Sequence, residues 1–348
     1  MRSFLKPAAG LTCLFALAVT GCSSSSDDSS DAAPSATQKA STTPSESASS
    51  TPTTSSSTTS YAPYVSVTTA ADTDSAGSPT TYNLAFAISD GSTCTPKWNG
   101  TTAIGNAAVT SRIAALKTSG ATVRVSFGGA SGKELAETCT SATALAKAYG
   151  EALDAAGSTQ ADFDIEGDTL TDSGSVARRS RAIALLQKER TGLKVSFTLP
   201  VMPSGLDSDS LALLESANDN AVAVSTVNIM TMNYGESYTG DMGDYAVTSA
   251  TATHTQLKKV FGLSDAGAWQ GMALTSMIGV NDVSGETFSL SDAAQVRKFA
   301  EEKEIAWVSM WSTFRDQRCE SGSSDDDAAT DCSGVTQTSG AFGEAFAG

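Results

Sequence analysis

The sequence has little positive charge and almost no histidine, and both shortages exclude classes of function. Lysine and arginine number 22 in 348 residues, against 38 aspartates and glutamates, which gives a formal net charge of −16. Nucleic-acid binding needs lysine and arginine to displace counterions from phosphates, so we expect no nucleic-acid partner. A single histidine argues against a histidine-built zinc or iron site and against a Ser-His-Asp triad.

The first apolar run, residues 8–19, is too short to cross a membrane, which needs about 20 residues. Arg2 and Lys6 precede this run, and Thr20-Gly21-Cys22 follows it. A basic start, a short apolar stretch and a small-residue cleavage site are typical of an export signal. Together they predict that the chain is exported.

The four residues Val19-Thr20-Gly21-Cys22 resemble the bacterial lipobox, in which cleavage occurs before the cysteine and the cysteine is lipidated. We therefore predict a lipoprotein signal peptide at residues 1–21 and a lipid on Cys22, which would anchor the protein without a spanning segment. The alternative is an ordinary secretory signal. The expected location is the bacterial cell surface, with membrane contact only through the lipid on Cys22, or the medium if the protein is secreted.

Residues 22–60 contain no aromatic residue, leucine, isoleucine or valine, and most of them are serine or threonine. Nothing in this segment can be buried to offset the entropy cost of ordering the chain. We therefore expect a disordered Ser/Thr/Pro linker that holds the following domain, residues 61–348, away from the surface.

Cysteines are few, at six. Cys13 would leave with the signal peptide and Cys22 would take lipid, so four remain, and an even number in an exported domain indicates disulfides. Of the three possible pairings, sequence order favours Cys94 with Cys139 and Cys319 with Cys332. A metal site is the alternative, but no Cys-x-x-Cys pair is present, and we predict no metal.

Strand and helix patterns alternate along residues 61–348. Strands are predicted at residues 64–68, 82–89, 121–127, 160–166, 193–199, 224–232, 272–278 and 305–311. Helices are predicted at residues 107–119, 141–156, 176–190, 207–218, 249–261 and 291–302. Several strands are apolar on both faces, as parallel strands covered by helices must be. The predicted fold is α/β, a single (β/α)8 TIM barrel. A doubly wound open sheet is the rival, but its Gly-x-Gly-x-x-Gly signature is missing after the first strand.

The strand predicted at residues 160–166 carries three acids at a period of two. Asp162, Asp164 and Glu166 therefore share one face, and Phe163 and Ile165 share the other. If the apolar pair packs against helices, three carboxyl groups point into the barrel. Like charges raise one another's pKa, so at least one proton should be shared, which supplies an acid near neutral pH. The alternative is an exposed strand with a solvated acidic face.

At these residues the chain resembles glycoside hydrolase family 18, the bacterial chitinase family. The family motif Asp-x-Asp-x-Glu on the fourth strand is matched by Asp162, Asp164 and Glu166, although the additional Asp often found three residues earlier is Thr159 here. Three further motifs occur in the family's order. They are Ser126-Phe127-Gly128-Gly129 on the third strand, Met230-Thr231-Met232-Asn233-Tyr234 on the sixth, where the family commonly has Met-x-Tyr-Asp, and Trp311 at the end of the eighth.

The resemblance implies a retaining hydrolysis without a protein nucleophile, because family 18 is an exception to the two-carboxylate scheme. Glu166 would protonate the glycosidic oxygen and later act as base for water. The substrate's own acetamido carbonyl would attack the anomeric carbon. Asp164 would hold the acetamido N–H and stabilise the resulting cation, exchanging a proton with Asp162. The implied partner is chitin or another polysaccharide that contains N-acetylglucosamine, and no cofactor is implied.

Further substrate-binding residues are expected at the carboxyl ends of the strands, where barrel enzymes have their sites. Trp311 has a flat face suited to a sugar ring, with a buried core role as its alternative. Met232 takes the place of the family's tyrosine, which holds the acetamido oxygen, so Tyr234 would supply that hydroxyl through a local shift or the oxygen is held otherwise. The full candidate set is Ser126, Gly128, Gly129, Asn233, Tyr234, Asn281 and Trp311.

Three functions share these residues. The first is a surface-anchored chitinase that cleaves β-1,4 linkages, and the second is an endo-β-N-acetylglucosaminidase acting on N-glycans. The third is a non-catalytic sugar-binding protein, favoured by the Met232 departure but opposed by the intact Glu166. The 26 residues 279–304 between the last two strands leave no room for an extra module that walls a deep groove. The groove should therefore be shallow and open, which suits cleavage within chains. We also expect the protein to be a monomer.

Overall fold

The computed structural model describes residues 59–320 and 331–348. The predicted signal peptide (residues 1–21), Cys22 and nearly all of the predicted linker (22–60) lie outside the described residues. The fold begins slightly earlier than residue 61, because Thr59 donates its hydroxyl to Ala300 O at 3.0 Å and Ser60 opens the first strand. In the described part of the chain, no helix has both the length and the apolar character needed to cross a bilayer.

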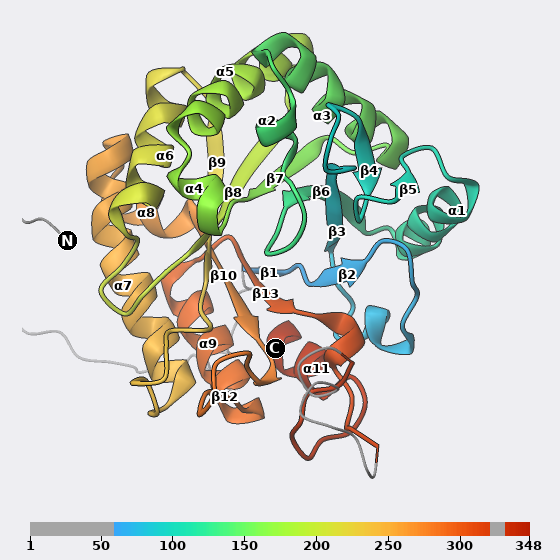
Figure 1. Cartoon of the computed structure of the whole chain (residues 1–348). Helices are drawn as coiled ribbons and strands as arrows, with labels where there is room; N and C mark the ends of the chain where they lie inside the picture. The colour runs from blue at the N-terminus through green and yellow to red at the C-terminus, as the bar shows by residue number, and fades with distance from the viewer. Residues whose placement is uncertain (1–58, 321–330) are drawn as a thin grey trace, which may run out of the picture. The chain divides into compact units, whose positions relative to one another are not determined.

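Eight parallel strands follow one another in chain order across one sheet, and all eight correspond to predicted strands (Figure 1). Their order in the sheet is their order in the sequence: β2 (Tyr64–Ser66), β3 (Thr81–Ser89), β6 (Thr122–Gly128), β7 (Gln160–Asp164), β8 (Lys194–Pro200), β9 (Val224–Met230), β10 (Met272–Met277) and β13 (Trp307–Trp311). A short strand, β1 (Ser60–Tyr61), adds to β13 in parallel. Sequential parallel strands with helical crossovers make the fold TIM-barrel-like.

The two ends of this series meet through side chains. Among the described residues, β2 pairs with β3, and β13 pairs with β10 and β1, so no ladder joins β2 to β13. The ring of Tyr64 on β2 nevertheless lies edge-on to Trp311 on β13, with centroids 5.9 Å apart. Closure of the barrel by hydrogen bonds stays a prediction, while the aromatic contact brings the first and last strands together at the site.

Helices surround the strands in Figure 1. The long ones are α1 (Ala107–Leu116), α3 (Ala142–Ala156), α5 (Ser173–Glu189), α6 (Ser208–Asp219), α7 (Met242–Phe261) and α9 (Leu290–Lys303). Each begins where a polar side chain accepts a hydrogen bond from the first turn, as Asp207 does at the start of α6. The helix predicted at residues 249–261 starts earlier, at Met242, because Asp241 accepts a hydrogen bond from Asp244 N and caps it there.

Shorter elements fill the connections and were not predicted. The strands are β4 (Pro96–Trp98), β5 (Thr102–Ala103), β11 (Gly279–Val280) and β12 (Thr287–Phe288). The helices are α2 (Leu135–Thr138), α4 (Gly167–Thr171), α8 (Asp265–Gln270), α11 (Ala341–Ala347) and the 3-10 turns η1 (Asp72–Ser75), η2 (Lys117–Ser119) and η3 (Thr313–Arg315). They are too short to leave a periodic pattern in the sequence.

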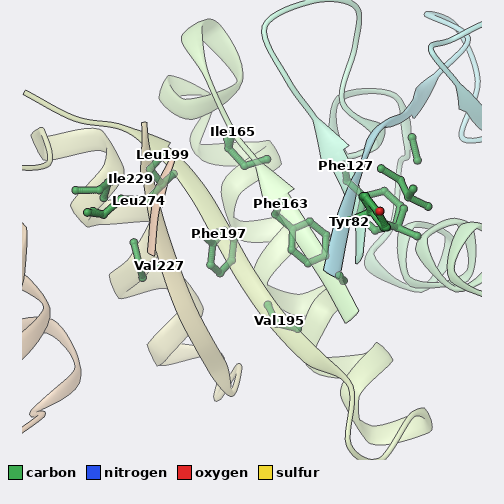
Figure 2. Close-up of a cluster of buried hydrophobic side chains, with 14 of the residues drawn as sticks. Tyr82, Phe127, Phe163, Ile165, Val195, Phe197, Leu199, Val227, Ile229 and Leu274 are labelled. Atoms are coloured by element: carbon green, nitrogen blue, oxygen red, sulfur yellow. The ribbon is translucent and has the colours of Figure 1, made fainter. Parts of the chain in front are cut away.

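The main core lies between the strands and the helices. Figure 2 shows Phe127, Phe163 and Phe197 side by side on adjacent strands. The ring of Phe163 is 5.3 Å from that of Phe127 and 5.7 Å from that of Phe197, centroid to centroid. Because successive strand residues point to opposite faces, this apolar packing turns Asp162 and Asp164 to the inside of the barrel. The predicted orientation of the acidic strand is therefore confirmed.

Both predicted disulfides are present. Cys94 pairs with Cys139, which joins the β3–β4 loop to the end of α2. Cys319 pairs with Cys332 and brackets residues 321–330, which lie outside the described residues. The first bridge fixes a segment that lies beside the site described next.

Candidate active site

Asp162 lies inside the barrel in a cage of hydroxyl groups. Its carboxylate oxygens accept hydrogen bonds from Ser126 Oγ at 2.7 Å, Ser196 Oγ at 2.6 Å, Thr198 Oγ1 at 2.9 Å and Tyr64 Oη at 3.0 Å. Hydroxyl groups from three strands, β2, β6 and β8, thus converge on one buried carboxylate of β7. These hydrogen bonds hold the Asp162 carboxylate in one position below the other two acids.

Below Asp162, a buried arginine fills the next layer of the interior. Arg124 on β6 donates to Asn83 Oδ1 at 2.7 Å and to Gln160 Oε1 at 3.0 Å, and its guanidinium lies 3.9 Å from the ring centre of Trp307. Burial lowers the pKa of Arg124, and the negative charge of Asp162 opposes that shift. Side chains therefore fill the interior at the level of Arg124, below the acids.

Asp164 and Glu166 stand above Asp162, at and just beyond the carboxyl end of β7. Burial raises the pKa of Asp164 well above its ordinary value, and the charges of Glu166 and Asp162 raise it further. Burial also raises the pKa of Glu166, Asp164 opposes the shift by hydrogen bonding, and the negative charge of Asp282 adds to it. The pair therefore retains protons at pH values where exposed acids have lost them, which is the property a proton donor needs.

Glu166 itself lies just beyond its strand. The strand predicted at residues 160–166 ends at Asp164, and Glu166 precedes the short helix α4 with an extended backbone. It retains the extended alternation because Ile165 N still donates to Thr198 O of β8 at 3.0 Å. Its side chain therefore remains on the same side as Asp162 and Asp164, and it faces the cavity.

A cavity of about 620 Å³ opens over these acids. Its walls come from the carboxyl ends of the strands and the loops that follow them: Tyr64, Phe86, Ile88, Asn99, Ala130, Ser131, Gly132, Asp164, Glu166, Thr198, Met230, Met232, Asn233, Thr275, Met277, Asp282, Trp311 and Phe314. No lysine, arginine or histidine is among these lining residues of the described chain. The titratable groups that face the cavity are three carboxyls and the Tyr64 hydroxyl.

Aromatic rings form one wall. Trp311 stacks against Phe86 at 5.7 Å between ring centroids and 22° between ring planes, and Phe314 lies edge-on to Trp311 at 5.8 Å. Trp311 is partly exposed and borders the cavity, as its predicted role requires. Phe86, on β3, is a wall residue that the sequence analysis did not identify.

The glycines and serine of the third strand support the site without lining this cavity. A Cβ on Gly128 would lie 2.0 Å from Asp164 O, and one on Gly129 would lie 2.8 Å from the Phe86 ring. Both have φ near +90 to +101°, and Gly129 N donates to Asp164 O at 2.9 Å. The two glycines thus let the backbone approach Asp164 closely. Ser126 is fully buried and holds Asp162.

The residues predicted at the end of the sixth strand lie in two different places. Met232 and Asn233 line the cavity, and Asn233 Nδ2 donates to Asp282 Oδ2 at 3.2 Å. Tyr234 is 3% exposed and packs instead against Tyr238 and Tyr245, with its hydroxyl 3.4 Å from Ser249 Oγ. The chain turns at Asn233, whose φ is +54°, so the next side chain points the opposite way. Tyr234 therefore does not line the cavity, and its hydroxyl points into the tyrosine cluster instead.

Asn281 is placed as a support. Its side-chain amide donates to Met277 O at 2.9 Å and to Gly279 O at 3.0 Å, and the residue is 4% exposed. These bonds fix the turn after β10, and the next residue, Asp282, is the one that lines the cavity. The signal for this was present in the sequence, because Asn281 and Asp282 are adjacent polar residues at a strand end.

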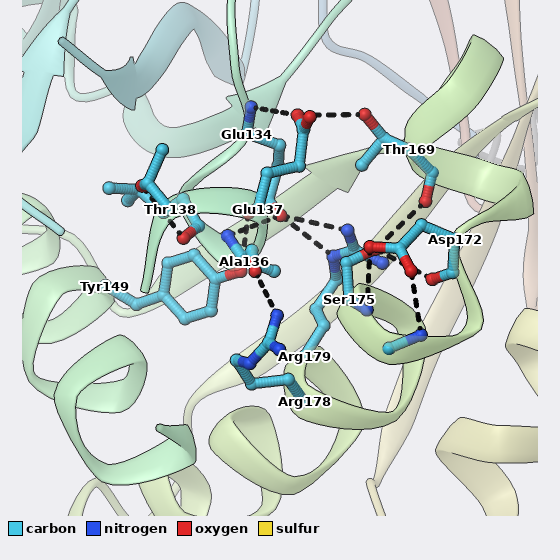
Figure 3. A network of polar contacts seen from close by, with 12 residues as sticks. Glu134, Ala136, Glu137, Thr138, Tyr149, Thr169, Asp172, Ser175, Arg178 and Arg179 are labelled. Atoms are coloured by element: carbon cyan, nitrogen blue, oxygen red, sulfur yellow. Dashed lines mark hydrogen bonds and ion pairs between the residues drawn. The ribbon is translucent and has the colours of Figure 1, made fainter. Parts of the chain in front are cut away.

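A further buried acid, Glu134, stands at the centre of the polar network in Figure 3. It accepts from Arg179 Nη2 at 2.9 Å, from Tyr149 Oη at 2.5 Å and from Ala136 N at 2.8 Å. Its backbone N–H donates to Glu137, which also accepts from Thr169 of α4 at 3.1 Å. This network joins the loop that carries Ser131 and Gly132 to the turn that follows Glu166.

Several supporting residues were missed by the sequence analysis although their pattern was visible. Ser196 and Thr198 alternate with apolar residues along β8, as Asp162 and Asp164 do along β7, so both strands predict one polar face. Tyr64 lies at the start of the first strand and could have been assigned to the interior in the same way. In the described residues no group of three or more histidine, cysteine, aspartate or glutamate side chains is arranged to hold a metal ion.

Comparison with known proteins gives relatives of one kind. No protein-family model matches the sequence. The chain is 35% identical over 275 residues to a probable bifunctional chitinase/lysozyme of Escherichia coli (strain K12), which covers 74% of this chain and 31% of that protein. It is 33% identical over 276 residues to endochitinase 11 of Metarhizium anisopliae, which covers 74% and 52%.

Among solved structures, the catalytic domain of a hyperthermophilic chitinase from Pyrococcus furiosus is similar with a TM-score of 0.72 and 28% identity. The match covers 82% of this chain and 93% of that one. The chain thus spans between about a third and a half of the length of the two curated relatives, but nearly all of the Pyrococcus domain.

Proposed function

Because the chain is a chitinase-like protein of glycoside hydrolase family 18, we propose that it hydrolyses β-1,4 linkages between N-acetylglucosamine residues in chitin-type chains. The observation that carries the proposal is the placement of Asp164 and Glu166. Both face one cavity, both have raised pKa values, and no basic side chain lines the cavity to neutralise them. Such a pair can hold and release a proton beside a bound glycosidic bond.

In the proposed reaction, Glu166 gives its proton to the glycosidic oxygen as the bond from that oxygen to the anomeric carbon breaks. The acetamido carbonyl oxygen of the same sugar bonds to the anomeric carbon and forms an oxazolinium ion. Glu166, now ionised, then takes a proton from water, whose oxygen opens that ring with retention. The first step leaves Glu166 ionised and the second step restores its proton, so the two steps together return the protein to its starting protonation state.

Asp164 would act between the two other acids. Protonated, it can donate to a neighbouring oxygen, and ionised it can accept the acetamido N–H and stabilise the positive charge of the intermediate. Asp162, held by four hydroxyl donors, is the fixed carboxyl group beneath it with which Asp164 would exchange a proton. Trp311 and Phe86 would carry the sugar ring on their apolar faces, and the relatives' names, chitinase/lysozyme and endochitinase, agree with such a substrate.

The first experiment is Glu166→Gln, measured by release of products from chitin oligomers. Removing a general acid should lower kcat by about 10²–10⁴-fold while leaving oligomer binding intact, because glutamine keeps the shape and loses only the titrating proton. N-glycoprotein serves as a parallel substrate and would reveal the N-glycan activity. Turnover retained in the variant, or oligomer binding without turnover in the unchanged protein, would contradict the proposal.

We further propose that the protein is exported and anchored by lipid on Cys22, on the strength of the basic, apolar and lipobox-like segments before it. Residues 22–58 would then tether the domain. Membrane fractionation of a Cys22→Ser variant tests this, and a variant that stays in the membrane fraction contradicts it.

A further inference from the structure

The sixth strand departs from the family pattern at the position next to the cavity. Where the family commonly has an aspartate, this chain has Asn233, which is neutral. Asn233 has a left-handed backbone with φ of +54°, and its Nδ2 donates to Asp282 Oδ2 at 3.2 Å. Its Oδ1 is buried without a hydrogen-bond partner among the described residues. The amide is therefore oriented by its bond to Asp282.

Asp282 comes from a different loop, after β10 and β11, and it lines the same cavity as Glu166. The loop is fixed from beneath. Asn281 donates to two carbonyls of the preceding turn, and Arg315 Nη2 donates to Val280 O at 2.7 Å. Burial lowers the pKa of Arg315 to about 10, and Asp282 opposes that shift. The Asp282 carboxylate is thus set on a rigid turn and faces the cavity.

Five charged or titratable groups surround Glu166. Asp164 stands beside it on β7, with Asp162 one layer deeper, and Asp282 faces the cavity from the β10–α9 connection. Tyr64 of β2 is neutral, because burial raises the pKa of its hydroxyl well above the ordinary value. The guanidinium of Arg315 is bound to backbone carbonyls behind Asp282. Asp282 is the exposed member of this set, so its influence is open to salt.

We propose that Asp282, oriented by Asn233, is a positioning residue that supplies from the seventh-strand loop the negative charge missing from the sixth strand, and so keeps the proton on Glu166. This inference rests on the proposed function for its kinetic consequence, but not for its electrostatic one. Whenever the Asp282 carboxylate is ionised, its negative charge makes the ionisation of Glu166 less favourable.

The test is a pH titration of Glu166 in the protein labelled with ¹³C at glutamate carboxyl carbons. The Glu166→Gln variant identifies the signal by its loss. In Asp282→Asn, the Glu166 midpoint should fall, and the alkaline limb of kcat/KM should move to lower pH by the same amount. On that limb the variant should be about two- to fivefold less active than the unchanged protein. Raising the ionic strength should move the midpoint in the unchanged protein and much less in the variant.

Two further variants keep the result specific. Asp209→Asn removes an exposed acid in the first turn of α6 and should leave the midpoint in place. The double variant Asn233→Asp with Asp282→Asn returns the negative charge to the sixth strand. It should reverse most of the fall in the Glu166 midpoint. A Glu166 midpoint that is the same in Asp282→Asn as in the unchanged protein would overturn the inference even in an active enzyme. If the protein hydrolyses no chitin oligomer, the proposed function fails while the titration still decides the role of Asp282.

Discussion

Glu134 and Asp164 are both almost fully buried, at 4% and 5% exposure, but they meet opposite surroundings. Glu134 is paired with Arg179, and each of its oxygens also accepts a further hydrogen bond. Asp164 has acids on both sides along its strand, and its Oδ1 has no hydrogen-bond partner among the described residues. The two sites are linked through Glu137 and Thr169, so one supports the other.

The difference separates a carboxylate that builds the fold from one that is kept for chemistry. Burial would lower the pKa of Arg179, but Glu134 and Tyr149 outweigh it and raise that pKa, so the guanidinium stays charged beside Glu134. At Asp164 burial and neighbouring acids act in the same direction and favour the protonated form. A buried acid with a cation is satisfied, whereas a buried acid among acids is destabilising and reactive.

The largest expected loss of stability comes from breaking the ion pair between Glu134 and Arg179. Arg179→Met should lower the free energy of unfolding by about 3–5 kcal/mol, because it leaves Glu134 buried and uncompensated. Urea unfolding at neutral pH measures the loss. The double variant with Glu134→Leu should recover much of it, since replacing both partners by apolar groups leaves no unpaired charge. A single variant as stable as the unchanged protein would show that the pair contributes nothing.

A smaller loss of stability is expected at Asp162, whose carboxylate accepts hydrogen bonds from hydroxyl groups, whereas Glu134 is paired with a cation. Ser126→Ala removes a 2.7 Å hydrogen bond to a buried carboxylate and should cost about 1.5–3 kcal/mol of unfolding free energy. Ser180→Ala is the matched control, because Ser180 is equally buried but bonds only to the neutral Ser216 hydroxyl at 3.0 Å. It should cost about 0.5–1.5 kcal/mol. Equal losses in the two variants would remove the distinction.

The smallest expected effect has the opposite sign. Asp164→Asn should stabilise the protein at neutral pH by about 0.5–2 kcal/mol while abolishing most activity. The folded-state pKa of Asp164 is raised, so its ionisation costs stability only above the unfolded pKa, about 3.9. The gain should therefore be absent below pH ~4 and grow toward neutrality. Thermal unfolding at both pH values measures it, and a variant less stable at neutral pH would contradict the comparison.

The sequence predicted the parts of this arrangement that depend on short-range periodicity. Alternation in Asp162-Phe163-Asp164 specifies which side chains face inward, and the eight strands and their order follow from apolar runs separated by helical patterns. Cysteine order predicted both disulfides. These features need no knowledge of what lies across the barrel.

What sequence could not supply was the direction of side chains at strand ends and the contacts across the interior. Tyr234 was assigned to the site, but the left-handed backbone at Asn233 turns it into a cluster of tyrosines. Asn281 was predicted to bind substrate, although its side chain stabilises the turn that precedes Asp282. Phe86 escaped notice because a phenylalanine within an apolar strand gives no local sign of facing a cavity.

The pairing of Ser60 with Trp307 determines at which end of the strands the chain enters the domain. Strand β1 runs parallel to β13, so the chain enters at the amino ends of the strands, whereas the cavity lies at their carboxyl ends beside Trp311. The amino-terminal entry and the cavity are therefore at opposite ends of the strands, so the approach to Trp311 and the acids is separate from the point where the chain joins the sheet.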